Sequence, residues 1–222
     1  MEEALNKSLY KFDKTIAKDL FYKNDYPWEI LDKIHDFILS EGEKLNPKIY
    51  DKLGKDVWIA RSAKIVKSVA ITGPCIIGEN AELRKSAFIR GDVIIGNNCI
   101  VGNSTELKNC ILFDNSEVPH FNYVGDSILG NYSHMGAGSI TSNVKSDKTL
   151  VVVKSGDEKI ETGLKKFGAM LGDNVEVGCN SVLNPGTVVG RSSNIYPTSC
   201  VRGVIPADSI YKNKDEIVKK LS

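Results

Sequence analysis

The chain has 222 residues, a formal net charge of +1 and 26% charged residues, and this balance gives no general reason to expect a nucleic-acid partner. The length suffices for one or two domains. The first residues are polar and charged, and no stretch reads as a signal peptide or a membrane span, so the sequence predicts a cytoplasmic protein with no membrane partner.

Residues 1–52 form a segment that we expect to be a helical N-terminal arm. Residues 5–21 are compatible with a helix. A second helix is expected to begin at Pro27, because the apolar residues that follow have helical spacing, and to end near Gly42. We expect the arm to cap the first coil of the structure that follows, where a core and unpaired strand edges would otherwise meet water. Contact with a substrate is the alternative.

From residue 57 onward an aliphatic side chain returns every six residues, with occasional five-residue steps. The series is Ile59, Ile65, Ile71, Ile77, Leu83, Ile89, Ile95, Val101, Leu107, Leu112, Val118, Val124, Leu129, Met135 and Thr141, then Leu171, Val177, Leu183, Val189, Ile195 and Val201. A period of six indicates a parallel β-helix, in which each unit is a short strand and a corner, and stacked coils share one core. Hexapeptide-repeat proteins form triangular prisms, which implies three units in each coil and about seven coils over residues 53–206.

The five cysteines are scattered without a CxxC motif. Cys75, Cys99 and Cys110 each lie two places before an aliphatic position, where a small side chain recurs along the repeat. We therefore expect them to pack in the core, and we expect neither a disulfide framework nor a metal site.

Residues 144–168 break the period and are rich in lysine. The run 151–153 consists of three valines that can pair as a strand. An ejected loop of this length is usually functional, although a solvated charged excursion is the alternative. Residues 207–222 carry Ile210, Ile217, Val218 and Leu221, which we interpret as a short C-terminal helix that closes the other end.

Arg90 and Lys108 each directly follow an aliphatic position of the repeat, and three six-residue units separate them. In a coil of three units they should therefore lie in adjacent coils, about 4.8 Å apart along the ladder. Like charges at that spacing repel one another, and a bound anion such as a phosphate would relieve the repulsion. The alternative is that the two cations are splayed into water.

His120 stands at a corner, two residues after Val118. Histidine is the natural general base near neutral pH, although a single surface histidine is more often idle. His134 is expected in the next coil of the same column. Because only these two histidines lie in the repeat, a metal site with three histidine ligands is not expected within one chain.

Two parts of the chain resemble known enzyme families. Residues 120–126 (HFNYVGD) with 136–143 (GAGSITSN) resemble the acetyltransferase domain of the bifunctional UDP-N-acetylglucosamine biosynthesis enzyme. Residues 165–186 are similar to the archaeal-type sugar-1-phosphate nucleotidylyltransferase/acetyltransferases. The resemblance covers residues 75–205. It implies a left-handed β-helix, a homotrimer, and transfer of an acetyl group from acetyl-CoA to the amine of a hexosamine 1-phosphate, without a required metal.

The resemblance also assigns roles to single residues. The catalytic base matches His120, and the cations that hold the sugar phosphate match Arg90 and Lys108, the pair that stacking selects. The other substrate contacts match Tyr123, Asn143 and His134, where the family often has Asn. The contacts to acetyl-CoA match Ala137, Asn143, Val144, Cys179 and Pro197, and Cys179 replaces a common Ser. The family's lysine after the Asn matches either Lys145 or Lys148.

Residues 1–52 are too few for a nucleotidylyltransferase domain, so we expect no nucleotidyl transfer. The sequence thus predicts an N-acetyltransferase that acts on an amino-sugar phosphate. Two alternatives stay open: a non-catalytic β-helix that serves as an assembly or regulatory subunit, and an acyltransferase for a nucleotide-linked amino sugar.

Overall fold

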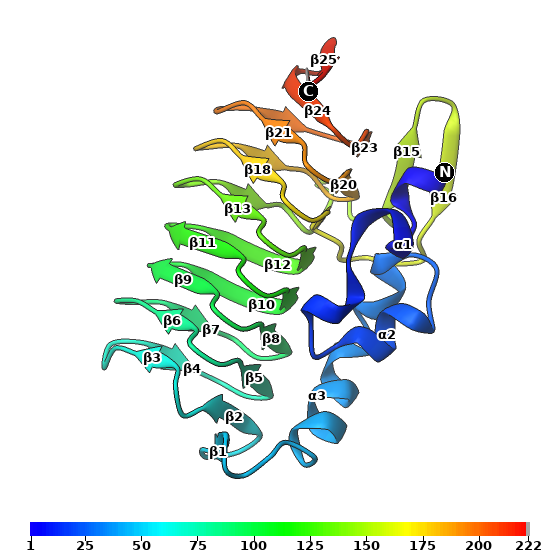
Figure 1. Cartoon of the computed structure of the whole chain (residues 1–222). Coiled ribbons are helices and arrows are strands. Elements are labelled where there is room, and N and C mark those ends of the chain that lie inside the picture. The colour runs from blue at the N-terminus through cyan, green and yellow to red at the C-terminus, as the bar shows by residue number, and fades with distance from the viewer. Residues whose placement is uncertain (221–222) are drawn as a thin grey trace.

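The computed structural model of the protein describes residues 1–220, in which short strands stack into one column with helices along one side (Figure 1). The strands form three faces. The first face holds β2 (Val57–Ala60), β5 (Cys75–Ile77), β8 (Val93–Ile95), the second halves of β10 (Glu106–Leu112) and β12 (Tyr123–Leu129), β17 (Ala169–Leu171), β20 (Thr187–Val189) and β23 (Val204–Ile205).

The other two faces repeat the same arrangement. The second face holds β3 (Lys64–Ile65), β6 (Glu82–Leu83), β9 (Ile100–Asn103), β11 (Glu117–His120), β13 (His134–Met135), β18 (Glu176–Val177), β21 (Asn194–Ile195) and β24 (Ser209–Asn213). The third face holds β4 (Ala70–Ile71), β7 (Phe88–Ile89), the first halves of β10 and β12, β14 (Ile140–Thr141), β19 (Val182–Leu183) and β22 (Cys200–Val201).

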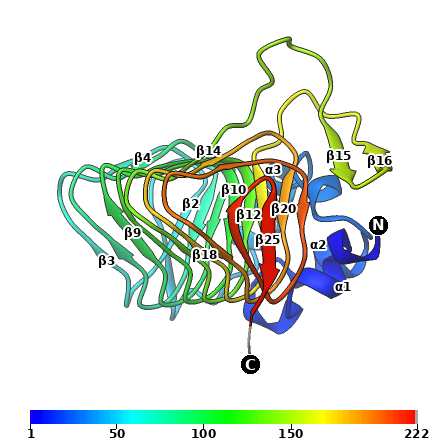
Figure 2. The ribbon, with the colours of Figure 1, turned by 90° about the horizontal axis from the view of Figure 1, so that it is seen from above.

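The register confirms three units in each coil. Partners on parallel neighbours are three units apart in the sequence. All three units are six residues long between Val57 and its partner Cys75, whereas one unit is five residues long between Cys110 and its partner Ser127. Seven complete coils result, and β23 and β24 begin an eighth. Seen from the C-terminal end, the chain runs clockwise while it advances toward the viewer, so the β-helix is left-handed (Figure 2).

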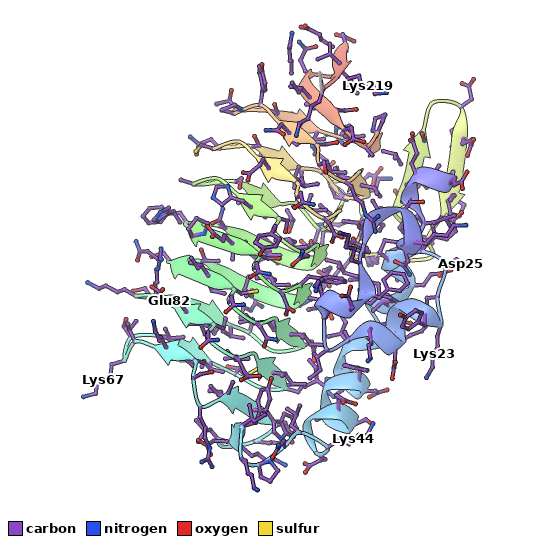
Figure 3. All side chains as sticks on the ribbon, viewed as in Figure 1. Lys23, Asp25, Lys44, Lys67, Glu82 and Lys219 are labelled. Atoms are coloured by element: carbon purple, nitrogen blue, oxygen red, sulfur yellow. The ribbon has the colours of Figure 1, made fainter. Side chains whose placement is uncertain are left out.

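The repeat builds one internal core. The aliphatic positions and the small residues before them, such as Cys75 and Ala81, are buried together along the axis. Corner residues adopt the left-handed backbone conformation that asparagine tolerates, as at Asn80 with φ 56° and Asn98 with φ 57°. Charged side chains such as Lys67 and Glu82 point away from the coils (Figure 3).

The N-terminal arm consists of short helices rather than one long helix before Pro27. They are η1 (Glu2–Ala4), α1 (Asn6–Leu9), η2 (Phe12–Lys14), α2 (Lys18–Tyr22), η3 (Pro27–Ile30) and α3 (Ile34–Gly42). The helical element expected from Pro27 to Gly42 is confirmed as the 3-10 turn η3 followed by α3.

The expectation that the arm caps the first coil holds only for the last residues of the arm. The helices lie along the first face, where they bury outward-pointing apolar side chains of successive coils, among them Ile76, Ile94, Ile111, Ile128 and Met170. This second apolar ladder needs a cover along the whole column, and the arm supplies it. Only the end of the arm, β1 (Tyr50–Lys52), pairs with the edge of the first coil, where it runs antiparallel to β2.

Residues 144–168 leave the column without disturbing it, because Ile128 pairs directly with Met170 across the insert. The predicted strand at 151–153 is confirmed for its last two residues, which begin β15 (Val152–Ser155), and this strand forms an antiparallel hairpin with β16 (Glu158–Glu161). The hairpin lies beside the N-terminal helices (Figures 1 and 2). Val151 and Val153 are buried in the same apolar cluster as the arm.

The predicted C-terminal helix is wrong. Residues 209–219 form an antiparallel hairpin of β24 and β25 (Glu216–Lys219), in which Ile210 pairs with Val218 and Tyr211 with Ile217. Tyr211 is buried against the last coil, so a strand that extends the column satisfies this segment better than a helix. Leu221, part of the same expectation, lies outside the described residues.

No helix within residues 1–220 has the length and apolar character needed to cross a membrane.

Candidate functional site

One line of predicted residues follows the corner between the second and third faces. The Gly138 N–H donates to the His120 carbonyl at 3.0 Å, so His120 and Ala137 lie in adjacent coils. The Asn180 N–H donates to the Ala137 carbonyl at 2.9 Å, and the Thr198 N–H donates to the Cys179 carbonyl at 2.8 Å, which continues the line through the next two coils. We name the line His120–Ala137–Cys179–Pro197 the corner column.

The corner column is open to solvent. His120, Cys179 and Pro197 are exposed, and Ala137 is half-buried. Three coil steps of about 4.8 Å make the column roughly 14 Å long. His35 and His134 each hydrogen-bond to a carboxylate, whereas within residues 1–220 the imidazole of His120 makes no hydrogen bond. An extended ligand can therefore lie along this corner, with a free imidazole at one end.

The second group of predicted residues lies at the corner between the third and first faces. The predicted neighbours Arg90 and Lys108 are confirmed in adjacent coils, since the Arg90 N–H donates to the carbonyl of Leu107 at 2.9 Å. The repulsion between the two cations is already offset, however. Arg90 donates to Glu106 at 2.5 Å and Lys108 donates to Asp126 at 3.2 Å, so each cation already has a carboxylate partner.

The two ion pairs differ in their surroundings. The Arg90 and Glu106 side chains are 45% and 33% exposed, so their pair is open to solvent. Lys108 is 24% exposed, while the Asp126 side chain is only 4% exposed. Neither carboxylate was among the residues predicted from the sequence. Lys108 pairs in register with Gly125, the neighbour of Asp126, so the coil spacing was the signal available in the sequence.

Tyr123 and Asn143 join this second group. The Asn143 amide donates to the Tyr123 hydroxyl at 3.3 Å and also to Asp126. Burial raises the pKa of the Tyr123 phenol, and the negative charges of Asp126 and Glu106 act in the same direction. The phenol therefore stays protonated at neutral pH. A Cβ at Gly125 would lie 2.5 Å from this hydroxyl, so a larger residue there would displace the Tyr123 ring from its present position.

His134 does not lie where the sequence analysis expected it. It pairs in register with Glu117, three residues before His120, and its Nδ1 atom lies 2.9 Å from Glu176. It thus belongs to the flat second face and not to the corner column. The error came from treating the interval between the two histidines as one coil, although that interval is shorter than the coil step in the observed register.

Two cavities adjoin the predicted ligand residues. Pro197 lines a cavity of about 460 Å³ at its own end of the corner column, together with the cations Arg202, Lys212 and Lys214. Val144 lines a different cavity of about 740 Å³ beneath the insert, with Lys145 and Arg202. Val144 is therefore separated from the corner column, and Lys145 rather than Lys148 faces this cavity.

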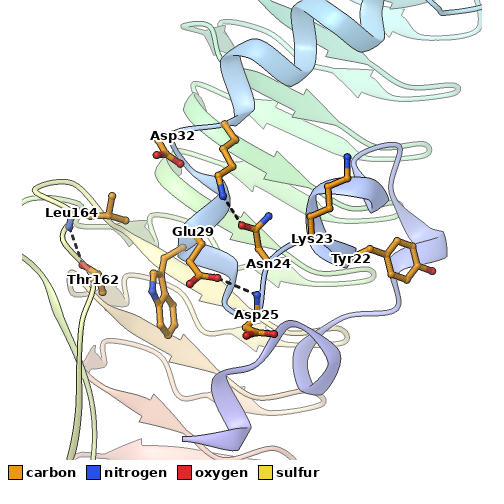
Figure 4. A pocket seen from close by; sticks show the side chains of 10 residues that line it. Tyr22, Lys23, Asn24, Asp25, Glu29, Asp32, Thr162 and Leu164 are labelled. Atoms are coloured by element: carbon orange, nitrogen blue, oxygen red, sulfur yellow. Dashed lines mark hydrogen bonds between the residues drawn. The ribbon is translucent and has the colours of Figure 1, made fainter.

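A third cavity, of about 520 Å³, lies between the arm and the insert (Figure 4). It holds none of the predicted site residues. Two of its charged side chains have partners within the arm: Lys33 donates to Asn24 at 2.5 Å, and Glu29 accepts from the N–H of Asp25 at 3.1 Å. Nothing in this cavity indicates catalytic chemistry.

The part of the chain that the structure describes contains no group of three or more His, Cys, Asp and Glu side chains placed to hold a metal ion. Cys75, Cys99 and Cys110 are buried as expected, and burial raises the pKa of Cys75 and Cys99 to about 12.

Comparison with known proteins agrees with the resemblance. The chain is 38% identical over 217 residues to the bifunctional protein GlmU of Methanococcus maripaludis, an alignment that covers 89% of this chain and 49% of that protein. It is 32% identical over 111 residues to the bifunctional sugar-1-phosphate nucleotidylyltransferase/acetyltransferase of Sulfurisphaera tokodaii, which covers 50% and 28%. The chain thus spans half or less of the length of these curated relatives.

Among solved structures, the UDP-N-acetylglucosamine acyltransferase of Francisella novicida shares 15% identity with a TM-score of 0.43, over 74% of this chain and 67% of that one. The model of the GMPPB C-terminal domain matches residues 71–191, more than half of the chain. This chain therefore belongs to the family of the GMPPB C-terminal domain.

Proposed function

We propose that the protein is an acetyl-CoA-dependent N-acetyltransferase that acts on an amino-sugar phosphate of the hexosamine 1-phosphate type. The observation that carries the proposal is the corner column, which aligns the predicted base and three predicted acetyl-CoA contacts in four consecutive coils. Positions that lie far apart in the sequence thereby become neighbours.

The column suits the shape of acetyl-CoA. Its thioester end would lie beside His120 and Ala137, and its pantetheine arm would follow the corner past Cys179 to Pro197. The cavity of about 460 Å³ at that end has three cationic side chains in its lining, which suit the phosphates of the nucleotide end.

The chemistry is a direct acyl transfer. The substrate amine attacks the thioester carbonyl, His120 accepts the proton from the amine nitrogen, the new C–N bond forms, the C–S bond breaks, and the sulfur leaves as the thiol after protonation. The residues around Arg90, Lys108, Tyr123 and Asn143 would hold the sugar and its phosphate. Such positioning supplies several kcal/mol of the barrier reduction.

The substrate phosphate would meet Arg90 first. The Arg90–Glu106 pair is open to solvent and is weak in water, so a phosphate can take the place of the Glu106 carboxylate. Lys108 is held by a carboxylate that is nearly buried and keeps its place.

We further propose a homotrimer. The first face is covered by the arm, whereas the third face is uncovered and carries outward apolar side chains such as Phe88, Ile140 and Val182. Association through the third face would bring the two corners of neighbouring chains together, and the two predicted groups lie at those corners.

The test is turnover measured by mass spectrometry of the acetylated product, with acetyl-CoA and three acceptors: glucosamine 1-phosphate, glucosamine, and a nucleotide-linked amino sugar. We expect product with the first acceptor. Thiol reagents are unsuitable as readout because Cys179 and Cys200 are themselves exposed. Product only with the third acceptor would correct the substrate class, and product with none would favour the non-catalytic alternative.

His120→Ala should lower the turnover rate about 10²- to 10⁴-fold, the usual loss for a general base. The melting temperature should change little, since the side chain is exposed. His35→Ala is the matched control, because His35 lies on α3 and not in the corner column. Wild-type turnover in the His120 variant would remove this residue from the mechanism.

A further inference from the structure

The Asp126 carboxylate stands at the centre of the second group of residues. Its side chain is 4% exposed and accepts from three side chains: Lys108 at 3.2 Å, Asn109 at 2.8 Å, and the amide of Asn143. A carboxylate removed from water is unfavourable unless such donors satisfy it. Every donor here comes from a neighbouring coil, so the carboxylate links three coils.

The link extends to the inserted segment. The Gly168 N–H donates to the Asp126 carbonyl at 2.8 Å, and the Phe167 N–H donates to the Asn143 carbonyl at 2.9 Å. Asn143 also reaches the Tyr123 hydroxyl at 3.3 Å. Asp126 therefore lies between the insert and the side chains that would face the sugar.

The backbone turn alone does not explain a charge at this position. Asp92, Asn109 and Asp126 occupy the same corner of three successive coils, with φ of 56°, 47° and 49°. Aspartate and asparagine both tolerate this conformation, and Asn109 shows that an amide suffices for the turn. In the same turn, Asp92 directs its carboxylate to the exposed His35 at 2.7 Å.

We propose that Asp126 is a positioning residue, which holds the Lys108 ammonium and the Asn143 amide in the geometry that receives the phosphorylated amino sugar. The proposal rests on the proposed function. Lys108 and Asn143 reach one fixed carboxylate from different coils, so their separation is set before the substrate binds. Preorganisation of this kind reduces the ordering that binding requires.

The first test is Asp126→Asn, which keeps the shape and the turn preference but removes the charge. With glucosamine 1-phosphate and acetyl-CoA, kcat/KM should fall about tenfold to a hundredfold, the range for one hydrogen bond to a charged group. The loss should be smaller with unphosphorylated glucosamine. The melting temperature should fall modestly, because an amide offers one acceptor oxygen where the carboxylate offers two, so both proteins are assayed below it. Asp92→Asn, in the equivalent turn, should retain wild-type kcat/KM.

A double variant separates positioning from a merely structural role. Because Asp126 acts through Lys108, the loss in the combined Asp126→Asn, Lys108→Met variant should be smaller than the product of the two single losses. Losses that multiply would contradict the proposal. A kcat/KM in Asp126→Asn equal to that of an active wild-type enzyme would also contradict the proposal.

A measurement without substrate distinguishes this proposal from the proposed function. Lys108 should react severalfold faster with a small amine-acylating ester in Asp126→Asn than in wild type, as read by peptide mass spectrometry, while its rate in Asp92→Asn stays unchanged. If wild type shows no acetyl transfer, the proposed function fails and this labelling still decides whether Asp126 restrains Lys108. An unchanged labelling rate overturns the restraint.

Discussion

Arg90 and Lys108 lie where the repeat spacing predicts, but two carboxylates that the prediction left out balance their charges. Stacking arithmetic places the two cations in adjacent coils, and the structure agrees. The same stacking also brings Glu106 and Asp126 beside them, so the four charges sum to zero. Binding of a phosphate is therefore an exchange of one anion for another at Arg90.

The two cations should accordingly respond differently to substitution. Arg90→Ala and Lys108→Ala should each raise the KM of the phosphorylated substrate about tenfold to a hundredfold, since each removes one charge-assisted contact. Only Lys108→Ala should also lower the free energy of unfolding, by about 1–3 kcal/mol, because it deprives the nearly buried Asp126 of its cation. Steady-state kinetics and denaturant titration measure the two effects.

Unphosphorylated glucosamine supplies the control for this pair of variants. Its KM should be nearly indifferent to both substitutions, because it carries no phosphate for either cation to hold. Equal losses on the two acceptors would remove the phosphate site from the proposal.

At the scale of elements, the arm and the insert form one packed unit on the first face. Trp28 of η3 is buried and stacks on Phe167, with ring centroids 5.6 Å apart. Phe167 precedes the Gly168 whose N–H contacts Asp126. The arm is therefore connected through the end of the insert to the second group of site residues.

Trp28→Ala should lower the free energy of unfolding by about 3–5 kcal/mol, as expected for loss of a buried indole. Amide hydrogen exchange should become faster in residues 151–167, since their apolar side chains pack against the same cluster. Tyr22→Ala is the control on the same arm. Because Tyr22 is 68% exposed, its replacement should change the free energy of unfolding little. Unchanged exchange in the insert would show that the arm does not support it.

Asp173 attaches the arm to the sixth coil and should make stability depend on pH. Its carboxylate accepts the N–H of Lys11 at 2.8 Å and of Asn131 at 2.9 Å, yet burial raises its pKa above the usual value. A carboxyl group whose pKa is raised by folding favours the folded state when protonated.

The raised pKa of Asp173 sets the direction in which stability changes with pH. The stabilisation from Asp173 is fully present below the unfolded pKa, about 3.9, and is lost as the pH rises through the raised folded pKa. Asp173→Asn should therefore flatten this part of the pH dependence of unfolding. Urea titrations of both proteins between about pH 4 and 7 make the comparison, and parallel curves would assign the dependence to other groups.

At the scale of the whole molecule, the three faces have different surroundings. The arm covers the first face, and charged side chains such as Glu82, Glu117 and Glu176 point outward from the second. The third face is left with exposed or half-buried apolar side chains. This asymmetry is what makes the third face the candidate for contact with other copies.

Multi-angle light scattering at micromolar concentration should therefore give a mass close to three times the 24.4 kDa of one chain. Phe88→Glu should shift the mass toward the monomer, because it places a charge on the third face. Tyr132→Glu is the control, since Tyr132 is exposed at the corner between the first and second faces. A monomeric wild type would contradict the trimer.

The six-residue period by itself determined the coils, their register and the inward core, because each unit positions its own aliphatic and small side chains. It also placed Arg90 beside Lys108, and once the coil step is known it aligns His120 with Ala137. These features repeat at a fixed spacing, so sequence distance converts directly into spatial distance.

Only the tertiary structure decided what covers the column and what neutralises its charges. The arm lies along the first face because an outward apolar ladder, from Ile76 to Met170, must be buried somewhere along its length. The C-terminal hairpin forms because the last coil offers a strand edge, which local helical spacing cannot reveal. The partners of Arg90 and Lys108 depend on which side chains meet across coils, and such contacts exist only once the chain has folded.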